Sequence, residues 1–172
     1  MIPANIKFIK YLLISITLFI IDQISKALIV NNPILSSGDQ ISIVDPILVL
    51  KKIENKGIAF GIDGDGHFSY IFTPLTIVLT LAIIFYLYKT SNQNSNLVNI
   101  SLSLILGGAL GNLFDRIFSG EVVDFIALFE SVFPFIFNLA DTFITVGMIM
   151  LLFSDILIRK NKKNEKEASK NF

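Results

Sequence analysis

Two aspartates, Asp124 and Asp141, lie in strongly apolar stretches of the sequence without a neighbouring basic partner. Ionisable side chains in such surroundings are costly and usually mark a functional site. If the two carboxylates meet where the dielectric constant is low, they cannot easily both ionise, and the pair then shares one proton. The ionised member can take a proton from water while the protonated member polarises a carbonyl group. On the residues alone, hydrolysis by such a pair and a pathway for protons or ions are equally compatible with the pattern.

Further charged residues accompany these aspartates. Asp22 and Lys26 are four positions apart, so on a helix they lie on one face and could form an ion pair. Arg116 follows Asp115 directly, and it either neutralises that carboxylate, extends to the lipid headgroups or organises a site.

The composition of the 172-residue chain restricts the available chemistry. With no Cys and a single His, the chain excludes disulfides, thiolate nucleophiles, Cys-ligated metals and His clusters. Its formal net charge of zero provides no overall field for nucleic acid. The hydrophobic share is 53% and the charged share 16%, whereas soluble domains carry roughly 25% charged residues. With a mean hydropathy of +0.69, the chain is predicted to be a membrane protein of one domain.

Four segments are apolar enough to cross a bilayer as helices, which takes about 20 residues. They are residues 8–30, 69–89, 97–118 and 133–158. The first segment imitates a signal peptide, but no small-x-small cleavage site follows it, so we expect it to be retained. The single domain is expected to cover residues 1–158, followed by a basic, disordered tail at 159–172.

The basic residues predict the orientation of these segments. Lys7, Lys10, Lys89 and the cluster that begins at Arg159 fall on one side of the membrane if all four segments span it. The lysines between residues 51 and 56 fall on the other side, where acidic residues offset them. Because basic residues prefer the cytoplasmic side, both termini are expected in the cytoplasm.

The first outer connection, between the first and second spans, is too long and too apolar for a plain linker. Ile41–Val44 and Ile47–Leu50 are typical of short strands interrupted by Pro46. Ile58–Phe60 follows a turn signal as a further strand-like stretch. The expected fold is therefore an all-α membrane protein with four transmembrane helices and a small extracytoplasmic β element.

The polar residues of three expected spans fall at one depth, near the outer surface of the membrane. They lie towards the outer ends of the first and third spans and near the start of the fourth: Asp22, Lys26, Asn112, Asp115, Arg116, Asn138 and Asp141. Random placement would scatter these residues, so we expect one site. The two asparagines either bond to neighbouring backbone or belong to that site.

Glycines in the third expected span predict close packing between helices. Gly107 and Gly111 form a small-xxx-small pair, and Gly108 lies on a neighbouring face of the same helix. Such glycines let another backbone approach closely, which would hold the polar residues at short range.

Five short motifs resemble those of the lipoprotein signal peptidase (signal peptidase II) family. They are Asp22-Gln23-x-x-Lys26, Asn55-x-Gly57-x-Ala59-Phe60, the run from Gly107 to Arg116, Val122-Val123-Asp124-Phe125 and Phe137-Asn138-Leu139-Ala140-Asp141. Each motif is weak by itself, but their shared order within a four-span plan is specific. The resemblance covers nearly the whole chain, from the first span to the fourth.

The resemblance implies a membrane-embedded aspartic endopeptidase of the bacterial cytoplasmic (inner) membrane, with its active site at the outer face. Such enzymes cut the signal peptide from a diacylglyceryl-modified prolipoprotein, before the lipid-bearing cysteine. By motif match, Asp124 and Asp141 are the catalytic pair. The implied substrate-binding residues are Asn55, Gly57, Asn112, Arg116 and Asn138, and the implied supporting residues are Asp22, Lys26 and Gly108.

The resemblance also implies that no metal or organic cofactor is needed. The expected partners are lipid-modified prolipoproteins and membrane lipids, with no nucleic acid, and a monomer is favoured. A proton-coupled transporter or channel using the same outer-facing carboxylates is the main alternative. It is disfavoured because the spans carry no second polar cluster towards the cytoplasmic half. A non-catalytic membrane scaffold is a third hypothesis.

Overall fold

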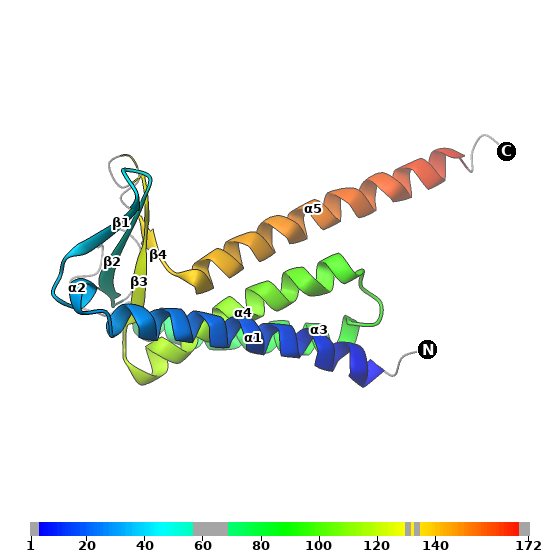
Figure 1. Cartoon of the computed structure of the whole chain (residues 1–172). Helices are drawn as coiled ribbons and strands as arrows, with labels where there is room; N and C mark the ends of the chain where they lie inside the picture. Colours follow the sequence, from blue (N-terminus) through cyan, green and yellow to red (C-terminus); the bar gives the residue numbers. More distant parts are fainter. Residues whose placement is uncertain (1–3, 57–68, 130–131, 133–134, 169–172) are drawn as a thin grey trace.

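The computed structural model of the protein describes residues 4–56, 69–129, 132 and 135–168. Its helices are α1 (Ala4–Val30), α2 (Pro33–Ser36), α3 (Ser69–Thr90), α4 (Asn96–Phe118) and α5 (Leu139–Ala168). Its strands are β1 (Gln40–Val44), β2 (Leu48–Asn55), β3 (Val122–Leu128) and β4 (Ile136–Phe137). Figure 1 shows the strands at one end of the helices, while α1 begins and α5 ends away from the sheet. The central helix is α4, because it packs against α1, α3 and α5.

Three helices in the described part of the chain are long and apolar enough to cross a membrane. They comprise Ile6–Val30 of α1, Thr73–Thr90 of α3 and Asn96–Phe118 of α4. The first three expected spans are thus confirmed as apolar helices. The apolar part of α5, Leu139–Ser154, is shorter, so the fourth span is not confirmed by the same measure.

The helix α5 begins at Leu139, not at residue 133 as the sequence led us to expect. The side chain of Asn138 accepts a hydrogen bond from the backbone N–H of Asp141 at 2.9 Å. In return, Oδ2 of Asp141 accepts a hydrogen bond from the backbone N–H of Asn138 at 3.3 Å. This reciprocal pair is a capping box, which satisfies N–H groups that the start of a helix leaves unbonded. The apolar residues just before it pair in the sheet as β4.

The far end of α5 also differs from expectation. The helix continues to Ala168, so the prediction of a disordered tail is wrong for residues 159–168. This segment is rich in Lys and Glu, which have high helix propensity. Extending a helix that is already formed costs less than starting one, because nucleation is the costly step.

The sheet contains four antiparallel strands in the order β1–β2–β3–β4. Strand β1 confirms the strand expected at Ile41–Val44, and β2 runs from Leu48 to Asn55, beyond its expected end at Leu50. The strands β3 and β4 were not expected from the sequence. The strand expected at Ile58–Phe60 lies outside the described residues. Because β3 pairs with β2, two segments far apart in the sequence meet at the end of the helix bundle.

Glycines of α4 allow its neighbours to approach closely, as predicted. A Cβ atom added at Gly107 would lie 2.9 Å from the carbonyl oxygen of Ser15 on α1, and one at Gly111 would also meet α1. A Cβ atom added at Gly108 would collide with the carbonyl oxygen of Ala140 on α5. This close packing brings polar residues of α1, α4 and α5 within hydrogen-bonding distance.

Candidate functional site

Asp124 lies within β3, and the residue is only 4% exposed. Its Oδ2 accepts a hydrogen bond from Nδ2 of Asn55 on β2 at 2.9 Å. Its Oδ1 accepts a hydrogen bond from Nδ2 of Asn138, just before α5, at 2.7 Å. The sheet and the start of α5 therefore hold this carboxyl group together.

Asp141 lies in the first turn of α5, where the capping box with Asn138 orients it. Its Oδ1 accepts a hydrogen bond from Nδ2 of Asn112 on α4 at 2.7 Å. A negative side chain at the N-terminus of a helix is also favoured by the helix dipole. The residue is half-buried, so part of it stays accessible.

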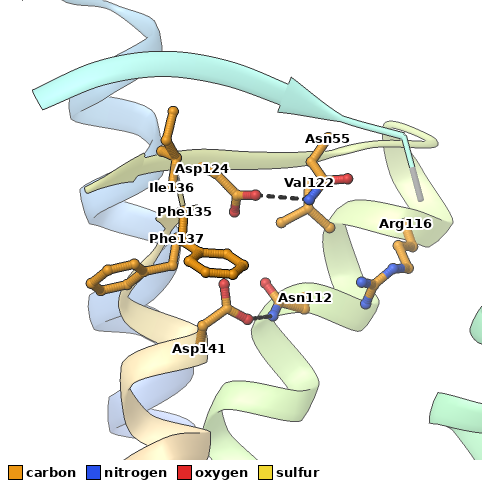
Figure 2. Close-up of a pocket in the computed structure, with 9 residues that line it drawn as sticks. All are labelled: Asn55, Asn112, Arg116, Val122, Asp124, Phe135, Ile136, Phe137 and Asp141. Carbon is orange, nitrogen blue, oxygen red and sulfur yellow. Dashed lines mark hydrogen bonds between the residues drawn. The ribbon is translucent and has the colours of Figure 1, made fainter. Parts of the chain in front are cut away.

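Asp124 and Asp141 line one cavity of about 320 Å³. Figure 2 shows the two carboxylates facing this space, with Asn55 beside Asp124 and Asn112 beside Asp141. The other lining residues are Arg116, Val122, Phe135, Ile136 and Phe137. Behind the cavity, the buried Asn138 connects the two halves, because its Nδ2 also donates to Oδ1 of Asn112 at 3.1 Å.

The surroundings of Asp124 raise the pKa of its carboxyl group to about 6. Burial is the largest cause, because it disfavours the charged form, and the nearby charge of Asp141 acts in the same direction. Hydrogen bonds from Asn55 and Asn138 and the charge of Lys26 lower the pKa, but they offset only part of the rise. Asp124 is therefore a group that can carry a proton near neutral pH.

A buried ion cluster lies next to the two asparagines. The ammonium of Lys26 lies 2.8 Å from Oδ2 of Asp22 and 2.6 Å from Oδ2 of Asp115, and it donates to Oδ1 of Asn112 at 3.1 Å. Asp22 in turn accepts the backbone N–H of Ala140 at 2.9 Å. The predicted Asp22–Lys26 pair is confirmed, and the cluster joins α1 to α4 and to the first turn of α5.

The alternative in which Arg116 neutralises Asp115 is not what the structure shows. Asp115 forms its ion pair with Lys26, and its other oxygen accepts a hydrogen bond from Nε2 of Gln23 at 3.0 Å. Arg116 instead lines the cavity with the two aspartates. A cation is thus available to a ligand there.

A second cavity, of about 400 Å³, adjoins the first. Its lining residues are Phe137, Asp141, Thr142, Thr145 and Val146, so the two cavities share Phe137 and Asp141. The second cavity lies along the apolar part of α5. A ligand that extends past Asp141 could therefore pass from a polar space into one along the apolar part of α5.

Most residues singled out from the sequence meet at this site. Asn55, Asn112, Arg116, Asp124 and Asp141 line the cavity. Asn138, Asp22 and Lys26 lie behind it, Gly108 lies at the contact between α4 and α5, and Gly57 lies outside the described residues.

Sequence reasoning assigned no role at the site to Gln23 or to the apolar lining residues. Gln23 bonds to both acidic partners of Lys26, and the apolar wall of the cavity is formed by Val122, Phe135, Ile136 and Phe137. Gln23 was visible next to Asp22, but its contact with α4 depends on how the helices dock. Among the residues that the structure describes, no three His, Cys, Asp or Glu side chains gather as ligands of a metal ion would.

The fold and the site together define a class of protein. The chain is a membrane protein with apolar helices and a small antiparallel sheet, and a cavity with two carboxylates lies where they meet. The sequence profile of the family "Signal peptidase (SPase) II" matches residues 14–157. The chain belongs to this family, which confirms the resemblance seen in its motifs.

A curated relative and two solved structures agree with this assignment. The lipoprotein signal peptidase of Shouchella clausii (strain KSM-K16) is 37% identical over 152 residues, which cover 88% of this chain and 95% of the relative. A bacterial membrane enzyme solved by the in meso method at 2.3 Å is 32% identical, with a TM-score of 0.76 over 89% of this chain and 91% of that one. A second such structure, at 1.9 Å, is 32% identical, with a TM-score of 0.72 over 84% and 91%. The chain is thus a membrane protease of lipoprotein processing, and the transporter hypothesis is not favoured.

Proposed function

We propose that the protein is an aspartic endopeptidase that removes the signal peptide from diacylglyceryl-modified prolipoproteins, cutting before the lipid-modified cysteine. One observation carries this proposal: Asp124 and Asp141 line a single cavity and are linked through the amides of Asn112 and Asn138. The family of the chain and the name of its relative support the substrate class.

In the proposed reaction the ionised aspartate takes a proton from water, and the water oxygen attacks the scissile carbonyl carbon. The protonated aspartate gives its proton to the carbonyl oxygen, which yields a tetrahedral diol. The C–N bond then breaks as the nitrogen takes the proton held by the first aspartate. One hydroxyl of the diol returns a proton to the second aspartate, which restores the starting state. The raised pKa of Asp124 favours it as the protonated member.

The substrate would lie across both cavities. Asn55, Asn112 and Arg116 have polar groups on the wall of the first cavity and would hold the peptide around the scissile bond. Gly57 would belong to the same subsite by its motif. The cavity along α5 would take an apolar part of the substrate that stays in the lipid. No cofactor enters this scheme, and we expect the protein to act as a monomer.

The proposed topology has four spans with both termini in the cytoplasm and the sheet at the outer face. The apolar part of α5 is short, but the helix continues without interruption beyond it. A helix needs about 20 residues to cross a bilayer, and α5 has 30. A lipid-anchored substrate that reaches the site sideways from the bilayer would meet the carboxylates at this surface.

The test is cleavage of a purified diacylglyceryl-prolipoprotein in detergent, followed by gel shift. We expect wild type to cleave and Asp124→Asn and Asp141→Asn to lose more than about 10³-fold in kcat, because each removes one proton-transfer group. Asp39→Asn, a change at an exposed aspartate outside the cavity, is the matched control and should keep wild-type activity. Near-normal turnover by either site variant would refute the mechanism.

A further inference from the structure

The end of the sheet at the turn between β1 and β2 exposes a group of large apolar side chains. Two segments meet there, because the backbone N–H of Phe129, just after β3, donates to the carbonyl oxygen of Ile47 at 2.8 Å. We call the exposed apolar residues of this end the sheet tip: Ile43, Val44, Ile47, Leu128, Phe129 and Val132. Their exposed fractions run from 37% for Leu128 to 68% for Val132. An exposed apolar patch of this kind marks a contact surface.

Charged side chains are scarce around the sheet tip. Within residues 40–48 and 126–129, only Asp45 is charged. The charged side chains of β2 lie towards the other end of that strand, at Lys51, Lys52 and Glu54. The two ends of the sheet therefore differ in polarity.

Phe129 has a backbone conformation that disfavours its own side chain. Its φ of 47° lies in the left-handed region, where a bulky residue is a genuine outlier and Asn or Gly is more common. The residue is 47% exposed, so contacts within the protein cover only part of its ring. Backbone strain of this kind clusters at functional positions. A ring presented outwards suits the surface of a membrane, where aromatic side chains are enriched.

The helices place the sheet tip at the level of the membrane surface. The apolar segments of α1 and α4 end at Val30 and Phe118, next to the sheet. Figure 1 shows the turn between β1 and β2 to one side of the helices, level with these two helix ends and not beyond them. A bilayer that surrounds the helices up to these ends therefore reaches the sheet tip. Irregular backbone does not occur in lipid-exposed hydrocarbon, so the tip can enter only the boundary between headgroups and acyl chains.

We propose that the sheet tip inserts into the interfacial layer of the lipid leaflet on its side of the membrane, with Phe129 as its aromatic anchor. Asp45, in the turn, stays among the headgroups. Because β3 runs from Val122 through Asp124 to Leu128 at the tip, the lipid contact holds Asp124 at a fixed depth relative to the leaflet. The inference does not rest on the proposed peptidase function, because it concerns only the contact between the sheet and lipid.

The absence of Trp from the chain allows a direct test. Phe129→Trp introduces a single fluorophore at the sheet tip. Ser37→Trp is the matched control, because Ser37 is exposed and directly follows α2, which lies farther out than the tip (Figure 1). Each variant is placed in nanodiscs of phosphatidylcholine and phosphatidylglycerol, where both membrane faces are open to water. Its fluorescence is then quenched either by acyl chains brominated near the headgroup or by iodide in the water.

The two quenchers should act in opposite order on the two variants. Brominated lipid should quench Phe129→Trp at least about twofold more than Ser37→Trp, and iodide should quench Ser37→Trp more. Equal quenching of both variants, or stronger quenching of Phe129→Trp by iodide, would overturn the proposal, because the tip would then face water. Protection of Phe129→Trp from both quenchers would also overturn it, because protein, such as a second copy of the chain, would then cover the tip.

A second variant keeps the test decisive if Tm in detergent shows that Phe129→Trp does not fold. Val44 lies at the tip end of β1 and is 49% exposed, and strands accept Trp readily. Val44→Trp should give the same order of quenching as Phe129→Trp. Neither measurement needs cleavage of a prolipoprotein, so failure of the lipid contact and failure of the peptidase function would be observed separately.

Discussion

At the scale of single residues, the protonation of Asp124 links stability to pH. Burial raises the pKa of its carboxyl group to about 6 in the folded protein, against about 3.9 in an unfolded chain. Between these values the folded state binds the proton more tightly, so the contribution of this carboxyl group to stability is fully present below pH 4 and is lost as pH rises through 6. The full difference is about 2–3 kcal/mol.

The direction of this pH dependence leads to a prediction for Asp124→Asn, whose side chain cannot ionise. The Tm of this variant minus the Tm of wild type, both measured in detergent, should increase between pH 4 and pH 6 and stay constant above pH 7. A Tm difference that is independent of pH across this range would show that Asp124 does not titrate as its burial requires.

The residues also show where sequence reasoning stops. The pairing of Asp22 with Lys26 was predictable, because their spacing alone places them on one helix face. The partner of Asp115 was not predictable. From the sequence alone, the adjacent Arg116 is as plausible a partner as Lys26, which comes near Asp115 only because α1 packs against α4. Local spacing therefore predicts contacts within a helix, whereas contacts between helices depend on docking geometry.

At the scale of elements, the contact between α4 and α5 positions Asp141. Gly108 lies against the carbonyl oxygen of Ala140, which precedes Asp141 in the sequence. Farther along the same interface, a Cβ atom added at Gly147 would lie 2.8 Å from the carbonyl oxygen of Ser101. At both positions an added side chain would meet backbone atoms of the neighbouring helix, which cannot move aside. Gly108→Ala and Gly147→Ala should each destabilise the protein by about 1–3 kcal/mol.

The two glycine variants should differ in activity. We expect Gly108→Ala to lower kcat by at least about tenfold more than Gly147→Ala at a similar loss of Tm, because small displacements of catalytic groups cost rate. Thermal unfolding and prolipoprotein cleavage in the same detergent measure both quantities. Equal losses of kcat would mean that the first turn of α5 tolerates displacement.

The elements differ in how well the sequence predicts them. The spans α1, α3 and α4 follow from length and apolarity, which need no knowledge of neighbours. The strand β3 is a short apolar run, and such runs fit a strand or a buried helix equally until a partner is known. Its partner β2 lies far away in the sequence. The start of α5 was readable in principle, because Asn138 and Asp141 have capping-box spacing.

At the scale of the whole molecule, the position of the site at one end of the bundle requires a fixed orientation in the membrane. Many large apolar side chains on α1 and α3 are exposed, including Leu28 at 69% and Phe85 at 63%, as expected of surfaces that face lipid. The sheet and the turn between α3 and α4 lie at opposite ends of these helices (Figure 1). If the sheet faces outward, a substrate anchored in the outer leaflet can reach the carboxylates without crossing the bilayer.

The chain suits a direct test of this orientation because it contains no Cys. Ser37 lies between α2 and β1, and Asn92 lies in the turn between α3 and α4; both are exposed polar residues outside the helices and strands, so a reagent can reach a Cys at either position. A membrane-impermeant maleimide applied to intact spheroplasts should label Ser37→Cys at once and Asn92→Cys only after permeabilisation. The basic residues already favour this arrangement, because Lys89 lies at the Asn92 end. The reverse labelling would place the carboxylates on the cytoplasmic side, where a prolipoprotein anchored in the outer leaflet could not reach them.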